Sequence, residues 1–328
     1  MKAWQVIEYG EPVEALRLTD VPDPGPGPGQ LLVRVGAAAL CFPDALLCRG
    51  QYQVKPPLPF TLGVEAAGEV VAAGPDVDGF AAGDRVLGMP VTGSLAEFAL
   101  FDAARTFHSP GELDDDGAAA LHMNYQTAHF ALHHRARLAD GETVLVHAGA
   151  GGVGSAAIQL ARAAGARVVA VVGGAAKAEI ARGLGADLVV DRHAEDFVAA
   201  VKDLTGGAGA DVVVDPVGGE AFTRSTRCVA FEGRIVVIGF TGGSFAQAAT
   251  NHMLIKNYAV LGLHWGMYTW KAPALVERVH RELVAGVEAG TVKPLVTERL
   301  PMADAPAALA RLAAGQTVGR LVVHPARH

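Results

Sequence analysis

The segment TVLVHAGAGGVG, residues 143–154, restricts the fold of this chain more than any other. It joins a continuous apolar run, typical of a buried parallel strand, to glycines spaced Gly149-x-Gly151-x-x-Gly154, and helix-forming residues follow at once. In such a unit the three glycines allow a tight turn, close approach of the backbone to a pyrophosphate, and close packing of helix on strand. The segment therefore predicts a dinucleotide-binding loop, with a glycine turn that binds nothing as the alternative. The predicted contacts are Gly149, Gly151, Gly152, Val153 and Gly154.

Further apolar runs follow the glycine loop at intervals typical of alternating strands and helices. The strands expected in this part of the chain are residues 143–149, 167–172, 187–191, 211–217 and 234–239. Between them lie GSAAIQLARAAG, AAKAEIARGLG and AEDFVAAVKDLTGG, each amphipathic and each ended by glycine, the usual C-terminal stop of a helix. Near-continuous apolar strands separated by helices predict an α/β fold with a parallel, doubly wound sheet.

The chain ahead of the glycine loop has a different pattern. Short β-rich runs such as LLVRVGAAAL and the Pro/Gly connector PDPGPGPGQ predict an irregular β domain. A long helical segment and a final strand, GRLVVH, come after residue 265. We therefore expect a β-rich domain over residues 1–122, the dinucleotide-binding domain over 123–264, and a return to the first domain over 265–328.

Composition and charge narrow the classes of partner. The hydrophobic fraction is 51% and the charged fraction is 19%, which predicts a packed globular protein rather than a disordered one. The net charge of −7 comes from interspersed residues without a basic run, so neither nucleic acid nor a membrane is an expected partner. We interpret the longest like-charge run, Asp114 to Asp116, as the solvated start of a helix. The N-terminus lacks the apolar region of a signal peptide and three cysteines form no CxxC pair, so we expect a cytoplasmic location.

The residues after the second expected strand indicate which dinucleotide binds. An NAD site usually places Asp or Glu there to accept a hydrogen bond from the ribose 2′-hydroxyl. Here the strand is followed by Gly173 and Gly174, then Lys177, and Arg192 follows the third strand. Two cations in place of a carboxylate favour the 2′-phosphate of NADPH, while solvated surface charges are the alternative for both side chains.

Four segments together resemble one known family. HAGAGGVGSAAIQLARAAGARVVAV, GLGAD, DVVVDPVGGEAF and GRIVVIGF are similar to the zinc-independent quinone oxidoreductase branch of the medium-chain dehydrogenase/reductase superfamily. The resemblance implies a GroES-like catalytic domain built from both chain ends, a Rossmann domain, and a cofactor in the cleft between them. It also implies a homodimer or tetramer formed through the Rossmann domains.

The same resemblance predicts a site without metal. Zinc-dependent relatives carry cysteine where Cys41 stands, histidine where Val64 stands, and a second cysteine where Met123 stands. Because catalytic zinc needs three protein ligands and valine offers none, we expect no metal. Cys41 is then interpreted as a small apolar wall of the substrate site, with no cation or base adjacent in sequence to activate its thiol.

Without a metal to polarise a carbonyl or alcohol, the predicted chemistry is hydride delivery to an acceptor that is already electrophilic. A quinone fits this requirement, and the protein then needs to hold donor and acceptor together and supply a hydrogen bond. The predicted function is an NADPH-dependent, metal-independent quinone reductase. A reductase of enones, alkenals or enoyl thioesters is the alternative, and a non-catalytic NADPH-binding protein is a third reading.

The resemblance assigns several of the remaining site residues. Tyr52 is the expected hydrogen-bond donor to the acceptor, with an ordinary half-buried tyrosine as the alternative. Asp44 either orients its neighbours, lines the cleft or is structural. Thr127 matches a threonine near the cofactor phosphates, with helix packing as its alternative. Cys41 and Phe42 are expected to line the substrate site. The ring-rich segment LGLHWGMYTW suggests His264 and Trp265 as further lining residues, with core or interface packing as the alternative. Gly239 and Phe240 follow the fifth strand and are expected beside the nicotinamide ribose, because open α/β sheets bind ligands at the strand C-termini.

Overall fold

The computed structural model describes residues 1–90 and 93–325, and these divide into two compact units. The first unit consists of Met1–Met123 with Pro294–His328, and the second unit consists of Asn124–Lys293. The chain thus leaves the first unit once and returns to it. The return begins at Pro294, however, and not at residue 265.

Hydrogen bonds to the long helix α10 (Pro273–Glu288) explain the later return. Gln126 Nε2, in α3 (Asp115–His129), donates to Val276 O of α10 at 3.0 Å. Just beyond the helix, Lys293 O accepts from Tyr125 OH at 2.8 Å and from Gln159 Nε2 at 3.1 Å. These contacts attach α10 and the residues that follow it to the second unit.

The second unit is built on a parallel sheet with the strand order of a doubly wound fold. In order across the sheet the strands are β11 (Leu188–Asp191), β10 (Arg167–Val172), β9 (Thr143–His147), β12 (Ala210–Asp215), β13 (Val229–Val237) and β14 (Ala259–Gly262). Every residue of β9 is buried, as expected for the centre of a sheet covered on both faces. The predicted fold class is thereby confirmed, and β14 is an edge strand that the sequence analysis missed.

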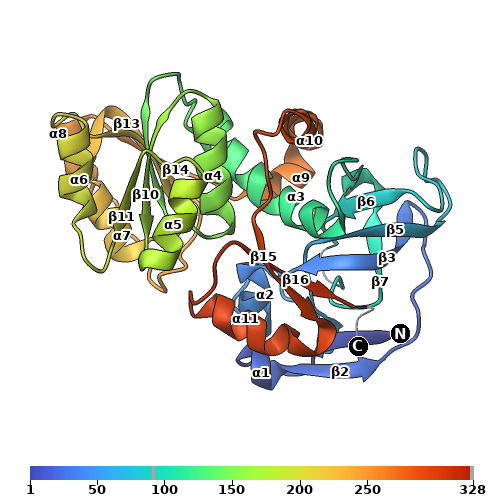
Figure 1. Ribbon diagram of the computed structural model, residues 1–328. Coiled ribbons are helices and arrows are strands. Elements are labelled where there is room, and N and C mark those ends of the chain that lie inside the picture. Colours follow the sequence, from blue (N-terminus) through green and yellow to red (C-terminus); the bar gives the residue numbers. More distant parts are fainter. Residues whose placement is uncertain (91–92, 326–328) are drawn as a thin grey trace. The chain divides into compact units, whose positions relative to one another are not determined.

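Helices cover both faces of this sheet. The connecting helices are α4 (Gly152–Ala163), α5 (Ala175–Gly183), α6 (Phe197–Leu204), α7 (Gly219–Ser225) and α8 (Thr250–Lys256). Figure 1 shows α4 and α5 on one side of the sheet and α6 and α7 on the other. The remaining elements of the unit are a π-helical turn (Phe130–Arg135), a 3-10 turn (Trp265–Met267) and α9 (Tyr268–Lys271).

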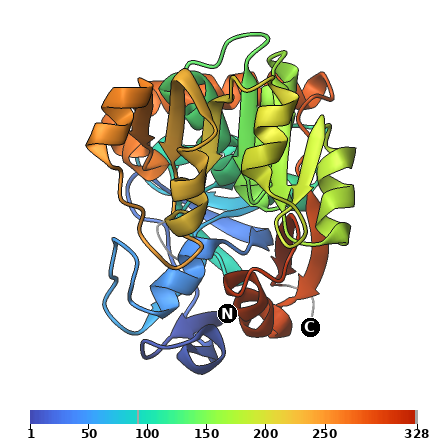
Figure 2. The same ribbon diagram turned by 90° about the vertical axis from the view of Figure 1, so that its left-hand side faces the viewer.

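The first unit is a mainly antiparallel β structure made from both chain ends. Its larger sheet has the order β15 (Val296–Pro301), β16 (Arg320–His324), β3 (Gln30–Ala39), β5 (Ala66–Ala73), β6 (Arg85–Gly88) and β8 (Thr106–His108), with β7 (Phe98–Asp102) also paired to β3. A smaller sheet holds β2 (Leu16–Asp20), β1 (Lys2–Val6) and β4 (Phe60–Thr61). The helices are α1 (Pro12–Ala15), α2 (Phe42–Cys48) and α11 (Ala305–Ala313), with 3-10 turns at Ala103–Arg105 and Met302–Asp304. Figures 1 and 2 show the red C-terminal elements among the blue N-terminal ones, where β16 pairs with β3.

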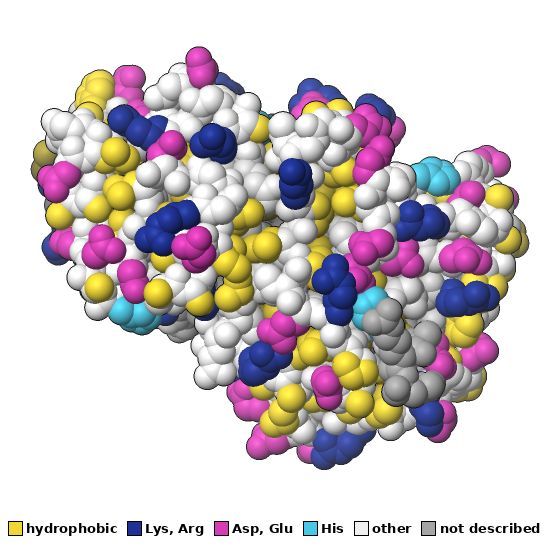
Figure 3. All heavy atoms as spheres, viewed as in Figure 1, with side chains coloured by type: hydrophobic (Ala, Val, Ile, Leu, Met, Phe, Trp, Pro, Cys, Tyr) yellow, Lys and Arg dark blue, Asp and Glu magenta, His cyan; other side chains and the backbone are white. Residues whose placement is uncertain are grey.

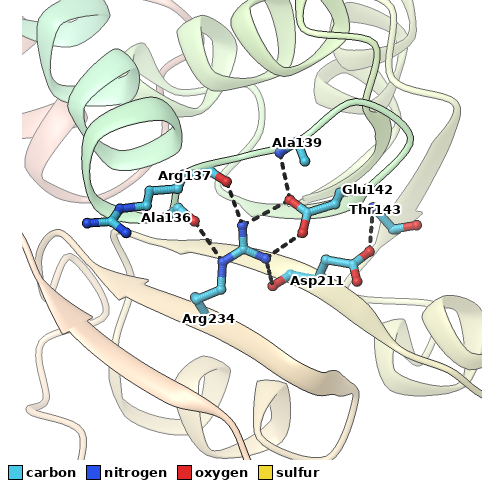
Figure 4. A network of polar contacts seen from close by, with 7 residues as sticks. All are labelled: Ala136, Arg137, Ala139, Glu142, Thr143, Asp211 and Arg234. Carbon is cyan, nitrogen blue, oxygen red and sulfur yellow. Dashed lines mark hydrogen bonds and ion pairs between the residues drawn. The ribbon is translucent and has the colours of Figure 1, made fainter.

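One arginine joins the segment after the π-helical turn to the first residues of the parallel strands in the second unit (Figure 4). Arg234, in β13, donates to both oxygens of Glu142 at 2.7 and 2.9 Å. It also donates to the carbonyls of Ala136, Arg137 and Asp211, which follow the π-helical turn or begin β12. Planar arginine suits this role because its five N–H groups reach several acceptors at once.

The surface carries charges of both signs. On the face drawn in Figure 3, Lys and Arg side chains are interspersed with Asp and Glu. Asp116 differs from the solvated helix start that was expected, because it is buried and pairs with Arg299 Nε at 2.5 Å and His324 Nε2 at 3.0 Å. Among residues 1–90 and 93–325, no helix has both the length and the apolar character needed to cross a bilayer.

Candidate cofactor and substrate site

The glycine loop lies between β9 and α4, as predicted. Gly151 is the N-cap of α4 and has no side chain to cap the first N–H groups, which an α-helix leaves without partners of its own. A Cβ atom on Gly154 would lie 2.2 Å from Ala148 O, so any side chain there would force the helix away from the loop. A Cβ on Gly149 would lie 3.0 Å from the Ala170 Cβ of β10. The loop therefore has the close packing and open helix N-terminus that suit a pyrophosphate.

Basic side chains gather at the end of β10. A Cβ atom on Gly173 would lie 3.2 Å from Arg192 Nε, so the guanidinium occupies the space where an acidic side chain of an NAD site would begin. Lys177 lies in the first turn of α5, and its pKa is lowered by burial and by the nearby charge of Arg192. The two cations predicted from sequence are thus brought together. A dianionic phosphate between them would offset their mutual repulsion.

Two further loops pack on each other where β12 and β13 end. Asp215 Oδ1 accepts hydrogen bonds from Val217 N and Gly218 N, both at 2.9 Å, which fixes the loop after β12. Gly218 has φ +73°, and a Cβ on it would lie 2.7 Å from Cδ1 of Phe240, in the loop after β13. Because all these strands are parallel, their loops share one edge with the glycine loop and Gly173, the edge at which open α/β sheets bind ligands.

A buried Ser-His-Asp set lies beneath these loops and was missed in the sequence. His147 Nε2 is 2.8 Å from Ser225 Oγ, and Asp215 is close enough to act on the charge of His147. Burial lowers the pKa of His147 to about 4, against the opposing effect of Asp215, so the ring is neutral at pH 7. All three residues are buried in the interior, which makes them part of the core rather than a hydrolytic site.

In the first unit, the segment ALCFPD forms the start of a helix. Cys41 is the N-cap of α2, and Cys41 N donates to Asp44 Oδ2 at 2.8 Å in a capping box. This accounts for the spacing of the two residues, since a capping box joins the N-cap to the third helical residue. Phe42 is the first residue of α2 and is half-buried. Asp44 therefore has a structural role as the third residue of this capping box.

Arg320 reaches the same place from the other end of the chain. Its Nη2 lies 2.5 Å from Glu65 Oε2 and 3.2 Å from Cys41 Sγ. The exposed fractions are 6% for Arg320, 1% for Cys41 and 0% for Glu65 and Asp44. Glu65 Oε1 also accepts from the backbone N of Met123 at 2.6 Å. A buried cation therefore lies beside Cys41, although none is near it in sequence.

Burial decides the protonation of this cluster. It raises the pKa of the Cys41 thiol well above its usual range, even though the charge of Arg320 opposes the shift. It also raises the pKa of Asp44 to about 7 and raises that of Glu65. Cys41 is thus a neutral thiol at pH 7, in keeping with a wall residue. Among the described residues, 1–90 and 93–325, no group of three or more His, Cys, Asp or Glu side chains is arranged to hold a metal ion.

Tyr52 packs half-buried against the core of the first unit, close to this cluster. Burial raises its pKa, and the negative charge of an ionised Asp44 acts in the same direction. Its hydroxyl therefore keeps its proton at pH 7 and is able to donate a hydrogen bond.

The other predicted contacts lie in the second unit. Thr127 is buried in α3, His264 is exposed, and Trp265 is buried in the turn that follows β14. Their roles toward cofactor or substrate stay predictions.

Family models match most of both units. The alcohol dehydrogenase GroES-like domain matches residues 27–111, and the zinc-binding dehydrogenase domain matches residues 152–280. Quinone oxidoreductase-like protein 2 of Rattus norvegicus is 39% identical over 269 residues, which are 82% of this chain and 77% of that protein.

Solved structures agree over nearly the whole chain. A probable oxidoreductase from Mycobacterium abscessus has 38% identity and a TM-score of 0.90, covering 99% of both chains. Escherichia coli quinone oxidoreductase complexed with NADPH has 29% identity and a TM-score of 0.92, covering 99% of this chain and 100% of that chain. The fold and glycine loop define a two-domain oxidoreductase, and the chain belongs to the zinc-independent quinone oxidoreductase branch of the medium-chain dehydrogenase/reductase superfamily. The predicted family is confirmed.

Proposed function

We propose that this chain is an NADPH-dependent, metal-independent reductase that transfers hydride to a quinone-type acceptor. The observation that supports the cofactor most strongly is that Arg192 lies against Gly173 with Lys177 close enough to act on its charge. When bound, NADPH supplies the hydride. The glycine loop binds its pyrophosphate through Gly149, Gly151, Gly152, Val153 and Gly154, while Thr127, Gly239 and Phe240 contact its nicotinamide half.

The protein positions the acceptor and supplies a hydrogen-bond donor to it. Tyr52 donates a hydrogen bond to the acceptor oxygen, since its raised pKa keeps the hydroxyl protonated. Cys41 as a neutral thiol, together with Phe42, His264 and Trp265, lines the acceptor site. Asp44 fixes Cys41 through the capping box, which makes it a positioning residue. Exclusion of water and correct placement account for most of the rate in this scheme.

The cofactor part of the proposal is tested by binding. Dissociation constants for NADPH and NADH are compared in the wild type and in Lys177→Ala, by cofactor fluorescence at pH 7.5. An exposed ion pair contributes up to ~1 kcal/mol and a charge-assisted hydrogen bond up to ~3 kcal/mol, so a preference for NADPH is expected to fall about tenfold. The matched control is Lys202→Ala, which removes a lysine from α6. An unchanged preference in Lys177→Ala would contradict the proposed site.

The acceptor part is tested by turnover. NADPH oxidation is followed with 1,4-benzoquinone, 9,10-phenanthrenequinone, a 2-alkenal and crotonyl-CoA as acceptors. Faster oxidation with the quinones supports the proposal, whereas preference for the alkenal or thioester would favour the alternative reductase. Binding without oxidation by any of the four would favour a non-catalytic protein.

We also propose a cytoplasmic location and a homodimer or tetramer assembled through the second unit. Light scattering on the purified chain tests the assembly, and a monomeric mass would contradict it.

A further inference from the structure

A histidine joins the basic group at the end of β10. His193 follows Arg192 in the loop after β11. A Cβ atom on Gly173 would lie 3.0 Å from His193 Nε2, closer than the 3.2 Å to Arg192 Nε. The ring nitrogen therefore points toward the backbone of Gly173, into the space that a side chain at this position would take.

Hydrogen bonds to the carboxylate of Asp191 hold the loop of His193 at this place. Asp191 Oδ1 accepts from Gly174 N at 3.0 Å and from His193 N at 3.1 Å. The same two bonds lower the pKa of Asp191, so it stays ionised at pH 6 and above. One carboxylate oxygen thus joins the loop after β10 to the loop after β11. The bond to His193 N fixes the backbone of this residue beside the loop after β10.

We propose that His193 is a third contact to the 2′-phosphate of NADPH, beside Lys177 and Arg192, and that the preference for this phosphate is stronger when the imidazole is protonated. This inference rests on the proposed NADPH site and adds a residue that sets its specificity and its response to pH.

The charges around the imidazole favour this role. Arg192 precedes it in the same loop, and Lys177 of α5 is near enough to Arg192 for the two charges to interact, so positive charge gathers beside His193. The facing acids are Asp191, already engaged by two N–H groups, and Glu195, whose Oε1 accepts from Asp191 N at 3.2 Å. An imidazole donates from one nitrogen when neutral and from both when charged, and histidine changes charge between pH 5 and 8. A phosphate dianion would therefore be bound more tightly by the protonated imidazole than by the neutral one.

The test uses nucleotide fragments, so that it does not depend on turnover. Isothermal titration calorimetry measures the affinity of 2′,5′-ADP and 5′-AMP for the wild type and His193→Gln, at pH 6.0 and pH 8.0. Glutamine keeps an N–H donor and removes the charge. For 2′,5′-ADP, the wild type is expected to bind about fivefold tighter than His193→Gln at pH 6.0 and less than about twofold tighter at pH 8.0, as for an exposed ion pair. The two proteins should bind 5′-AMP equally.

Controls separate this effect from other causes. The 2′-phosphate itself changes charge near pH 6, but the protonation of the free nucleotide is the same in both titrations and cancels in their ratio. His108→Gln removes an exposed histidine from β8 and should leave every affinity unchanged. His193→Ala is a second variant, expected to lose at least as much affinity as the glutamine variant.

The possible outcomes distinguish failure of the proposed NADPH site from failure of the inference about His193. If the wild type binds 2′,5′-ADP no tighter than 5′-AMP, the NADPH site itself is wrong and the inference fails with it. If the wild type prefers 2′,5′-ADP but both His193 variants bind it equally well at both pH values, only the inference is overturned. Equal weakening of 5′-AMP and 2′,5′-ADP would show that His193 shapes the loop without contacting the phosphate, and would also overturn it.

Discussion

Replacing Arg320 by methionine is predicted to destabilise the first unit more than any exposed charge change. Arg320 Nη2 lies 2.5 Å from Glu65 Oε2 and 3.2 Å from Cys41 Sγ, and all three residues are buried. Methionine keeps much of the apolar volume but leaves Glu65 and Asp44 as buried carboxyls without their cation. Removal of one partner from a buried ion pair typically costs about 3–5 kcal/mol, so we expect a loss of about 4 kcal/mol in the free energy of unfolding at pH 8.

The loss should depend on pH. Arg320 lowers the pKa of both Asp44 and Glu65, against the larger effect of burial, so its removal raises both values further. An acid whose folded pKa lies above its unfolded value destabilises the protein as pH rises from the unfolded value to the folded one. The cost of Arg320→Met is therefore expected to be about 2 kcal/mol smaller at pH 5 than at pH 8.

Urea unfolding followed by tryptophan fluorescence gives these free energies. A double-mutant cycle with Glu65→Gln should recover about 2 kcal/mol of the loss, because no carboxylate is then left unpaired at that position. Arg311→Met is the matched control, since Arg311 pairs with Glu298 at 2.6 Å on the surface and should contribute less than about 1 kcal/mol. A loss in Arg320→Met no larger than in this control, or one independent of pH, would refute the reasoning.

Three further substitutions test other parts of the structure. Asp44→Asn keeps the acceptor for Cys41 N but cannot ionise. Because burial raises the pKa of Asp44 to about 7, thermal unfolding should show the variant to be about 2 kcal/mol more stable than wild type at pH 8 and no more stable at pH 4. Arg234→Leu should lower the free energy of urea unfolding by about 3 kcal/mol, whereas equal stability would show that its five hydrogen bonds contribute little. Gly173→Asp places a carboxylate beside Arg192, and cofactor fluorescence should show NADPH binding about tenfold weaker with NADH binding retained; equal loss of both would indicate a general disruption of the loop.

The parallel sheet was predictable because its pattern is local. Strands such as β9 and β10 are continuous apolar runs, and glycine ends the helices between them. β14 escaped prediction because it is a short edge strand, Ala259–Gly262, without the full burial that makes the others apolar throughout. Nor does any sequence pattern distinguish the π-helical turn at Phe130–Arg135 from the end of an ordinary helix.

In the candidate site, too, some residues could be predicted from local sequence patterns and others could not. Lys177 and Arg192 were predictable because parallel strands bring the residues after each strand to one edge. His193 was not, since its closeness to Gly173 depends on the loop bonds of Asp191. Arg320 lies 279 positions from Cys41 in the chain, so only the pairing of β16 with β3 brings the two together. Local patterns carry no information about such a contact.

The most direct measurement is the initial rate of NADPH oxidation by 9,10-phenanthrenequinone, made on protein dialysed against a metal chelator and repeated with NADH. A reductase of the proposed kind should oxidise NADPH in a quinone-dependent manner, at the same rate before and after dialysis, and use NADH at least about tenfold less efficiently. No quinone-dependent oxidation, or a rate lost on dialysis and restored by zinc, would contradict the proposed function.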